Sequence, residues 1–498
     1  MKIKNIINIV LLGLAAGTLF PSCDALDIMQ DNKLSASNMW RDATDVTTST
    51  YGIYYRMRSN FVQDDQNVFY WGELRVGDYM WGPSLESQVN DNNMIAVRES
   101  EMTGSSSSCG WSALYTTIDQ ANSVLKYAYK VSMTDDERGF AVGQAAFARA
   151  YCYFWAVRLW GDVPMNLVPI ESSTQEETYP VRTDKAKVYA QIKADIDTAE
   201  AHSSQLGSNK YLATAPAVNM LKADYALWMY STQNGGDSYL TMASDALSAI
   251  GISSSNLLSD YASVFSRTNK CNKEVVFALN NNQTEKLLGG YYWYYYYPSN
   301  LVASSYQQNP VPINATQWWS YSQQFLDVLL DSKKTNNDSR VDCNVGYGPY
   351  GAGDNHYISW PNKFLGDMST AKTVMDCDLM YYRYAYAVMM DAELKYYQKN
   401  YSGALASLNL VAQRAYGKAN FYTDATKDGV LDALVKEYFL EFPCEGQIWW
   451  ALIRLGKIWD YNPALKTKQA SNANILLWPI SNSSMNKNHN LKQTEGWS

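Results

Sequence analysis

The chain has 498 residues, enough to bury a large core and, by length alone, to form about three domains. It carries 41 Lys and Arg against 49 Asp and Glu, for a formal net charge of −8. No run of five like charges occurs, whereas binding to a phosphate backbone depends on clustered cations. The composition therefore argues against a nucleic-acid partner.

The first residues have the pattern of an export signal. A positively charged start is followed by an apolar run that is too short for a stable membrane span and ends at Ser22-Cys23. A cysteine directly after a small residue suits a bacterial lipoprotein signal, because its thiol can be acylated. We expect residues 1–22 to be a lipoprotein signal peptide, Cys23 to be lipidated and residues 23–35 to form a tether. The alternative is an ordinary secretory signal in which Cys23 is incidental.

Apolar residues at helical spacing dominate the remaining chain. Ser35 or Ser37 can cap the first helix, and a long aromatic-rich loop region is expected at residues 60–110. From about residue 251 to 377 the helical spacing weakens, and Gly, Asn, Pro and aromatic residues become frequent. The pattern predicts helices at about 36–58, 111–128, 135–160, 184–204, 214–232, 378–399, 402–416 and 430–442.

Paired helices of this kind indicate a helical repeat. In the segment A-E-L-K-Y-Y-Q-K-N-Y-S-G-A-L-A-S-L, small and aromatic residues occur where a tetratricopeptide repeat places its contacts: Ala392, Tyr401, Ala404 and Leu405. We therefore predict a mainly α protein built from tetratricopeptide-like helix pairs. Its single domain, residues 36–498, would have a helical scaffold at about 36–250 and 378–454 and a loop-rich insert at about 251–377.

Four segments in order resemble the SusD/RagB family of surface lipoproteins. The first is Cys23 followed shortly by L-D-I, and a tail L-W-P-I-S…N-L-K-Q-T-E-G-W closes the chain. The other matching positions are, in the second segment, Arg149, Ala150, Tyr151, Phe154, Gly161, Asp162, Val163 and Pro164; in the third, Arg383, Tyr384, Ala385, Ala392 and Glu393; in the fourth, Glu437, Glu441, Glu445, Gly446, Trp449, Leu452 and Arg454. The chain departs from the family at Tyr438, Ile448 and Ala451, which we interpret as scaffold positions.

The resemblance implies a function and a location. It implies a lipid-anchored protein on the cell surface at the outer membrane, with a glycan as ligand. It also implies a TonB-dependent transporter of the SusC type as the partner that receives the glycan. Some relatives handle peptides, so a peptide ligand is the alternative.

Sequence patterns typical of enzymes are incomplete. The stretch from Gly346 to Gly351 has dinucleotide-type glycine spacing, but it follows no clear strand and opens no helix, so we interpret it as a loop. Residues 424–429 begin like a calcium loop, yet position twelve is Val435 instead of Glu, so a helix cap is expected there. The three histidines belong to no recognisable catalytic or metal motif. We expect no cofactor and no metal site.

Glu437, Glu441 and Glu445 fall on one helical face and could imitate the carboxylate pair of a glycosidase. Consecutive turns of one helix cannot flank a sugar bond from opposite faces, as acid and base must. We therefore expect these three residues to form salt bridges with a structural role. A glycan hydrolase remains the third hypothesis, and release of shorter products would distinguish it.

Aromatic residues with polar groups are unusually frequent, with 39 Tyr and 16 Trp against 13 Phe. Flat rings with polar neighbours suit sugars, which present apolar C–H faces surrounded by hydroxyls. In the run from Tyr291 to Tyr297 the side chains cannot all point inward on a helix or strand, so some face solvent or ligand. The alternative is that such rings cover the scaffold as a minor core. The candidate ligand-binding residues are Trp71, Arg75, Asp78, Tyr79, Trp81, Tyr291, Trp293, Tyr294, Tyr296, Trp318 and Trp319.

Overall fold

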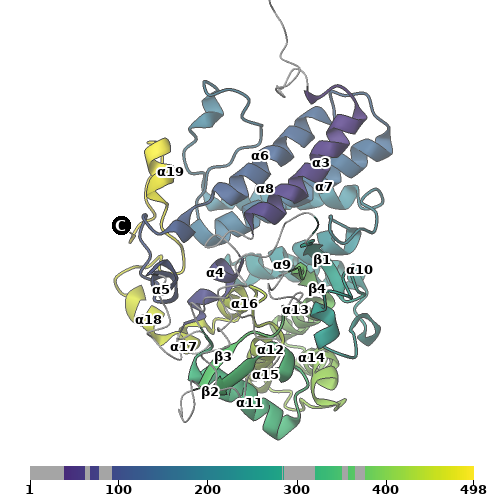
Figure 1. Cartoon of the computed structure of the whole chain (residues 1–498), viewed down its shortest axis with the longest axis vertical. Helices are drawn as coiled ribbons and strands as arrows, with labels where there is room; N and C mark the ends of the chain where they lie inside the picture. Colours follow the sequence, from purple (N-terminus) through teal and green to yellow (C-terminus); the bar gives the residue numbers. More distant parts are fainter. Residues whose placement is uncertain are drawn as a thin grey trace, which may run out of the picture. The chain divides into compact units, whose positions relative to one another are not determined.

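The computed structural model describes residues 39–61, 68–77, 92–282, 284, 320–349, 357–364 and 376–497. The chain divides into Met1–Arg41 and one compact unit, Asp42–Ser498. The predicted signal peptide, Cys23 and the tether lie outside the described residues. Figure 1 shows the compact unit as a body of packed helices, which confirms the predicted mainly α fold.

The N-terminal half of the unit is a layer of four long helices that run side by side (Figure 1). Helix α7 (Asp135–Trp160) is the central one and contacts the other three. Every residue of it from Ala141 to Trp160 is buried, as expected for a helix surrounded by other helices. The four helices are α3 (Ala43–Asn60), α6 (Ser112–Tyr127), α7 (Asp135–Trp160) and α8 (Lys185–Ala201).

Among the remaining long helices, those that follow one another in the sequence also pack against each other. The helices of the predicted repeat, α13 and α14, contact each other, and Ala392 and Ala404 on them are fully buried. Small side chains at these two positions fit the predicted close approach of a helix pair. The helices are α9 (Ala215–Thr232), α10 (Asp237–Ile250), α13 (Tyr384–Tyr397), α14 (Tyr401–Tyr416) and α15 (Lys427–Glu441).

Side-chain caps fix where several helices begin. Thr134 and Glu137 form a capping box at the start of α7, and Gly161 at φ +70° ends that helix. The Thr426 side chain accepts a hydrogen bond from Gly429 N at the start of α15, and Asp424 accepts one from Thr426 N. The prediction that residues 424–429 cap a helix is therefore confirmed.

Shorter elements connect the long helices. The other α-helices are α4 (Val68–Gly72), α5 (Asn92–Arg98), α11 (Gln323–Asn336), α12 (Val341–Asn344), α16 (Ile448–Arg454), α17 (Ile458–Tyr461), α18 (Pro463–Gln469) and α19 (Asn482–Lys487), and all of them except α11 are short. The 3-10 helices are η2 (Leu74–Val76), η4 (Ser107–Cys109), η5 (Glu176–Thr178), η6 (Ser254–Asn256) and η7 (Ala262–Phe265).

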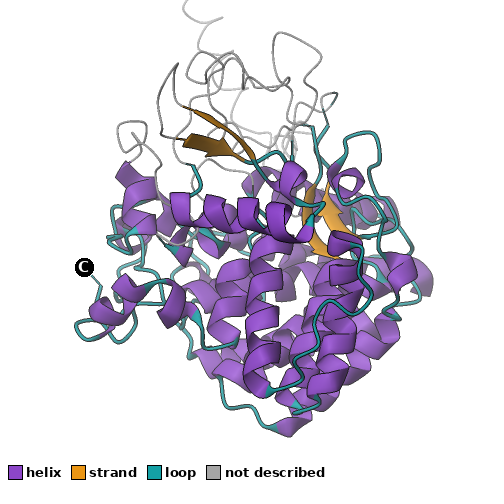
Figure 2. Ribbon diagram, turned by 90° about the horizontal axis from the view of Figure 1, so that it is seen from below, coloured by secondary structure: helices purple, strands orange, loops and turns teal. Residues whose placement is uncertain are grey.

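Two pairs of short antiparallel strands lie on one side of the helices (Figure 2). Strand β1 (Val275–Leu279) pairs with β4 (Leu379–Arg383), and β2 (Gly346–Pro349) pairs with β3 (Tyr357–Trp360). A side chain at Gly346 would collide with the indole ring of Trp360 2.2 Å away, so close packing explains this glycine.

Three predictions need correction. The helix expected from residue 378 begins at Tyr384, because 379–383 pair with β1 as a strand. The glycine-spaced stretch expected as a loop contains strand β2 at its start. The first long helix is capped by Asp42, whose side chain accepts from Thr44 N and Asp45 N, and not by a serine further upstream.

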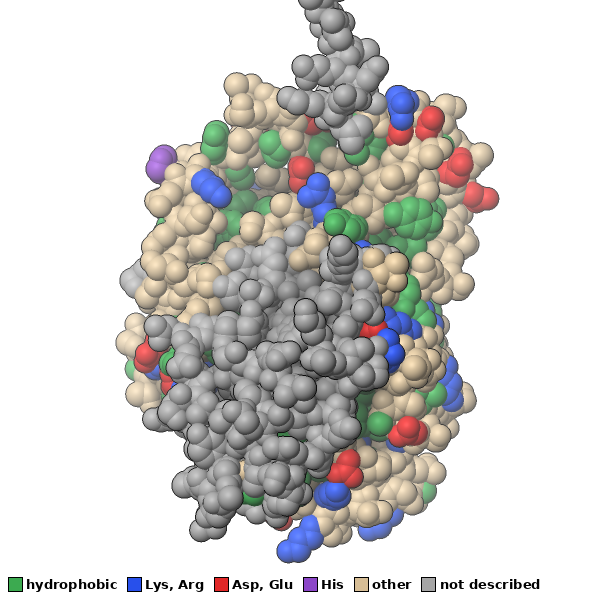
Figure 3. Space-filling view, viewed as in Figure 1, with side chains coloured by type: hydrophobic (Ala, Val, Ile, Leu, Met, Phe, Trp, Pro, Cys, Tyr) green, Lys and Arg blue, Asp and Glu red, His purple; other side chains and the backbone are tan. Residues whose placement is uncertain are grey.

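The surface carries mixed charges. On the face drawn in Figure 3, Lys and Arg side chains are interspersed with Asp and Glu side chains and form no continuous basic patch. This distribution agrees with the net charge of −8 and does not have the pattern of a phosphate-binding surface.

Candidate functional site

Two of the predicted ligand-binding residues belong to the core. Trp71 has no exposed surface; its ring packs against Trp155 and Trp160, and its Nε1 donates a hydrogen bond to Ser108 O at 3.1 Å. Arg75 is also fully buried, although charged side chains rarely are. Burial excludes contact of these two side chains with a ligand, which corrects the prediction for both.

Hydrogen bonds explain why a buried Arg75 is tolerated. Its Nε donates to Ser100 Oγ at 3.1 Å, and its other two guanidinium nitrogens donate to main-chain carbonyls of residues 475–477. Its guanidinium also lies 4.7 Å from the centre of the Trp449 ring. Arg75 therefore fastens the C-terminal segment to the core.

The other predicted ligand-binding residues lie outside the described residues and remain a prediction. They occur in two stretches, residues 78–91 and 285–319. These residues are Asp78, Tyr79, Trp81, Tyr291, Trp293, Tyr294, Tyr296, Trp318 and Trp319.

The described residues that flank these two stretches meet at one buried turn. Before the first stretch, the Glu73 carboxyl accepts hydrogen bonds from Cys444 N at 2.9 Å and from Gly446 N. After the second stretch, Tyr321 OH lies 3.6 Å from Cys444 Sγ. Segments more than two hundred residues apart in the sequence are thus fixed to the turn that follows α15.

Two glycines make this meeting point possible. A Cβ atom on Gly72, at the end of α4, would lie 2.2 Å from Gly446 O. Gly446 itself has φ +73°, a left-handed conformation that favours glycine, and a Cβ there would lie 2.8 Å from Val68 O. The backbone of the first flanking segment therefore lies directly against the turn.

The Glu73 carboxyl has an unusually high pKa. Burial raises its pKa to about 8, although the amides of Gly446 and Cys444 and the charge of Lys363 act in the opposite direction. A carboxyl with this pKa gains or loses its proton near neutral pH. The link between α4 and the turn therefore includes a carboxyl that titrates near neutral pH.

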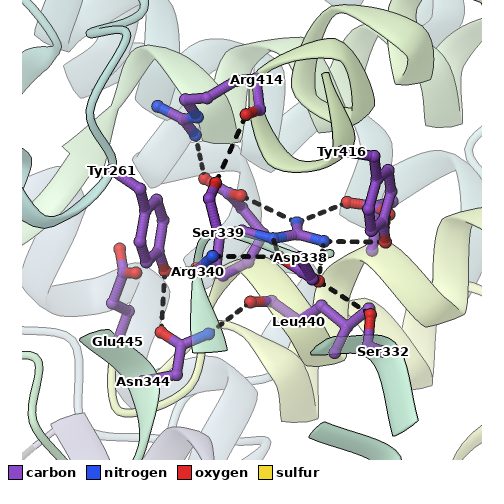
Figure 4. Close-up of polar contacts among 12 residues, drawn as sticks. Tyr261, Ser332, Asp338, Ser339, Arg340, Asn344, Arg414, Tyr416, Leu440 and Glu445 are labelled. Carbon is purple, nitrogen blue, oxygen red and sulfur yellow. Dashed lines mark hydrogen bonds and ion pairs between the residues drawn. The ribbon is translucent and has the colours of Figure 1, made fainter. Parts of the chain in front are cut away.

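A buried ion-pair network lies next to the turn (Figure 4). Arg340, just before α12, is fully buried and lies 2.9 Å from Asp338 Oδ2, 2.6 Å from Glu437 Oε2 and 3.0 Å from Glu441 Oε2. It also donates a hydrogen bond to Tyr416 OH at 2.8 Å. This arginine connects the region expected to be loop-rich to the end of α15.

Arg383 forms a second centre in the same network. At the end of β4, it lies 2.7 Å from Glu441 Oε1, 2.7 Å from Glu445 Oε2 and 3.0 Å from Glu274 Oε1. Lys363 adds a further pair with Glu445 at 2.8 Å. The prediction that the three glutamates have a salt-bridged, structural role is confirmed, because each of them pairs with a buried cation.

The network also determines the protonation of Glu441. Burial alone would raise its pKa, but Arg414, Arg383 and Arg340 together lower it to about 2. A general acid needs a carboxyl that holds its proton near the working pH, and Glu441 does not meet this requirement. Its three arginines keep Glu441 ionised, which suits a role in holding segments together.

A separate buried cluster joins four helices. Arg454 of α16 lies 2.7 Å from Glu393 Oε1 of α13 and 3.0 Å from Asp224 Oδ1 of α9. Tyr438 of α15 donates a hydrogen bond to Glu393 Oε2 at 3.1 Å. Tyr438, one of the positions at which the sequence departs from the family pattern, is thus a scaffold contact, as interpreted from the sequence.

One hollow among the described residues was not recognised from the sequence. It has a volume of about 420 Å³ and lies against α6, where Trp111, Tyr115 and Asp119 follow one another at intervals of four residues. These residues fall in or at the start of the helix expected at about 111–128, for which no site was predicted. The change from aromatic to acidic residues along one helix face was the signal that could have identified the hollow.

The described residues contain neither a candidate metal cluster nor a membrane-spanning helix. Within the described ranges, no group of three or more His, Cys, Asp or Glu side chains is placed to hold a metal ion. No helix in the part of the chain that the structure describes is long and apolar enough to cross a membrane.

Comparison with known proteins identifies relatives along nearly the whole chain. Residues 230–497 match the model of the SusD family, and residues 26–228 match a model described as "Starch-binding associating with outer membrane". Two SusD-like proteins of Formosa agariphila are 23% identical over 211 residues and 22% identical over 288 residues. These alignments cover 42% and 56% of this chain but only 39% and 52% of the relatives, so the chain spans about half of their length or less.

Solved structures share the fold. NanU of B. fragilis superposes with a TM-score of 0.75 at 24% identity, covering 94% of this chain and 100% of NanU. A SusD superfamily protein of Bacteroides fragilis NCTC 9343 gives a TM-score of 0.77 at 21% identity, covering 92% of this chain and 100% of the other. At these identities the likeness shows the fold alone. Since the SusD family model covers more than half of the sequence, the chain belongs to the SusD family.

Proposed function

We propose that this protein is a lipid-anchored protein of the bacterial cell surface that binds a glycan and delivers it to a TonB-dependent transporter of the SusC type. Proteins of the SusD family are binding proteins. The description of the model matched by residues 26–228 names both starch binding and association with the outer membrane. In this proposal the protein captures oligosaccharide without cleaving it.

We place the glycan on aromatic rings from residues 78–91 and 285–319. The observation that carries this placement is the shared turn: Glu73 and Tyr321, which flank the two stretches, both contact Cys444. Contact of both flanks with one turn supports the proposal that rings from the two stretches contact one ligand. Trp81 and Trp293 are the leading contacts in this proposal.

The expected affinity is modest. A well-stacked aromatic contact contributes about 0.5–1.5 kcal/mol beyond burial, so two or three rings provide only a few kcal/mol. With a small number of hydrogen bonds, this corresponds to a dissociation constant of about micromolar to millimolar. Weak binding suits a protein that must release its ligand to a transporter.

Calorimetry with purified oligosaccharides and, in parallel, with peptides tests the proposal. We expect saturable binding of at least one oligosaccharide, no binding of peptides, and unchanged oligosaccharide length when the mixture is analysed by chromatography. Binding of peptides alone would contradict the glycan assignment. Shorter products that follow the purified protein would contradict binding without cleavage.

The anchor is tested separately by cell fractionation. Cys23→Ala removes the thiol that would be acylated, so the variant is expected to leave the membrane fraction. Cys271→Ala is the matched control, because it removes a half-buried thiol elsewhere and should remain with the membrane. Retention of the Cys23→Ala variant would contradict the lipid anchor.

A further inference from the structure

The hollow beside α6 is built from segments far apart in the sequence. Its volume is about 420 Å³, within the range of small-molecule sites. It lies between α3, α6, the segment that follows α7, and α19. The residues used in the argument below are Arg56, Trp111, Tyr115, Asp119 and Lys487.

One face of α6 provides an aromatic wall followed by polar groups. The rings of Trp111 and Tyr115 are one turn apart, with centroids 5.5 Å from each other. Asp119 follows on the next turn and Asn122 on the one after it. An apolar surface that passes into a carboxylate and an amide within about three turns matches a sugar ring, which combines C–H faces with hydroxyls.

The walls of the hollow are held rigidly. Tyr115 OH donates to Pro164 O at 2.5 Å, and Asn122 Nδ2 donates to Asn166 O at 2.9 Å. On the opposite side, Asn488 Nδ2 donates to Pro180 O at 2.7 Å. These bonds fix the segment after α7 against both α6 and the C-terminal tail. A preformed site loses little conformational entropy when a ligand binds.

Several polar groups at the hollow have hydrogen-bonding capacity left over. Asp119 Oδ1 accepts from Ile170 N at 2.8 Å, but within the described ranges its second oxygen has no partner. Trp111 is 8% exposed and packs against Trp160 and Tyr115, so a small part of its indole ring reaches the hollow. Arg56 uses only Nε, which donates to Gln120 Oε1 at 3.3 Å. Lys487 is exposed and forms no ion pair with any described residue.

The charges around the hollow favour an anion. Arg56 and Lys487 contribute two positive charges, and Asp119 contributes one negative charge. Asp119 is partly desolvated: burial and the charge of Glu171 raise its pKa, whereas the Ile170 amide and the charge of Arg56 lower it. A ligand with one carboxylate can pair with the two cations while its hydroxyls donate to Asp119.

We propose that this hollow is a second carbohydrate site, which binds a single acidic sugar ring such as a hexuronate. The ring lies against Trp111 and Tyr115, its carboxylate pairs with Arg56 and Lys487, and a hydroxyl donates to the second oxygen of Asp119. This site is separate from the glycan platform, by which we mean the aromatic rings of residues 78–91 and 285–319 proposed above. It shares no residue with that platform.

Saturation-transfer NMR titrations with free monosaccharides test this site. The probes are D-glucuronate and D-galacturonate, with D-glucose and D-galactose as neutral counterparts of the same ring. We expect at least one uronate to bind the wild-type protein roughly tenfold more tightly than its neutral counterpart. The combined Arg56→Ala and Lys487→Ala changes should remove that preference, because both cations are exposed and their loss leaves the fold intact.

Two further variants keep the test specific. Asp119→Asn retains the acceptor for Ile170 N but replaces the second oxygen by an amide, so binding of both uronate and neutral sugar should weaken. Lys492→Ala removes an exposed lysine of the same tail that does not line the hollow, and should change nothing. Trp81→Ala with Trp293→Ala should leave uronate binding unchanged, so failure of the platform and failure of this site are distinguishable. No saturation by either uronate, or equal binding in the wild-type protein and the Arg56/Lys487 variant, would overturn the proposal.

Discussion

Two regions of the molecule each contain a tryptophan and an arginine. Trp71 and Arg75 lie in the core, whereas Trp111 and Arg56 line the hollow beside α6. Around Trp71, the indole N–H and all three guanidinium nitrogens of Arg75 donate to protein acceptors. At the hollow, Arg56 is exposed and donates through one nitrogen, to Gln120 Oε1. Residue type alone therefore does not identify a binding site. Access to solvent separates the two arginines: Arg75 is fully buried, whereas Arg56 is exposed beside the hollow.

The buried side of this comparison should be destabilised most by loss of Arg383. Arg383→Ala leaves Glu274, Glu441 and Glu445 each without one cation in a buried site, which is expected to cost about 3–5 kcal/mol of unfolding free energy. Urea denaturation measures this change. The control Lys193→Ala breaks an exposed pair with Asp197 and should cost less than about 0.5 kcal/mol. Equal effects of the two changes would show that the network does not hold the fold.

Trp71 provides the direct test of core against ligand contact. Trp71→Ala removes a fully buried indole and leaves a cavity, with an expected loss of about 3–5 kcal/mol in unfolding free energy. Glycan affinity of the folded fraction should not change. A variant with normal stability and weakened glycan binding would reverse the assignment of Trp71 to the core.

Acid should weaken the network through Glu441. Its pKa falls from 4.5 in the unfolded chain to about 2 in the folded protein, so its stabilising effect is complete above about pH 4.5 and is lost as the pH falls towards 2. At about 1.4 kcal/mol per pKa unit, the effect is roughly 3 kcal/mol. Urea denaturation between pH 6 and 2 should therefore show a steeper loss of stability in the wild-type protein than in Glu441→Gln. Identical slopes would mean that the three arginines do not lower this pKa.

A cap at the helical scaffold gives the smallest effect. Thr134→Ala removes the acceptor for Glu137 N at the start of α7 and should cost about 1 kcal/mol of unfolding free energy. Thr134→Ser keeps the hydroxyl and should cost clearly less. Thermal denaturation of the two variants checks the difference, and equal melting temperatures would contradict a contribution from the cap.

The sequence predicted best those elements that local signals define. Helix α7 was expected at residues 135–160 and occurs there, because Thr134 and Glu137 mark its start and Gly161 marks its end. The helix pair α13 and α14 was likewise indicated by small residues at contact positions. Strand β4 was missed because its partner, β1, lies about a hundred residues away, and local spacing cannot show a long-range pairing.

The site was harder to predict than the fold. Helix geometry holds for Glu437 and Glu441, but Glu445 lies in the turn beyond the end of α15, which corrects the prediction that all three share one helical face. The cationic partners of the three glutamates lie in segments that only the folded chain brings together. Trp71 and Arg75 were assigned to the ligand because their sequence neighbourhood is irregular and aromatic. Their burial depends on rings from α7 and on the C-terminal segment, which no local pattern reveals.

We propose that aromatic rings from residues 78–91 and 285–319 together bind the glycan. Calorimetric titration of the same oligosaccharide into Trp81→Ala and Trp293→Ala tests it most directly, with melting temperatures recorded for both variants. The account predicts that each change weakens binding by about tenfold or more while the melting temperature stays nearly constant, the opposite of Trp71→Ala. Normal binding by both variants, or unfolding of both, would contradict it.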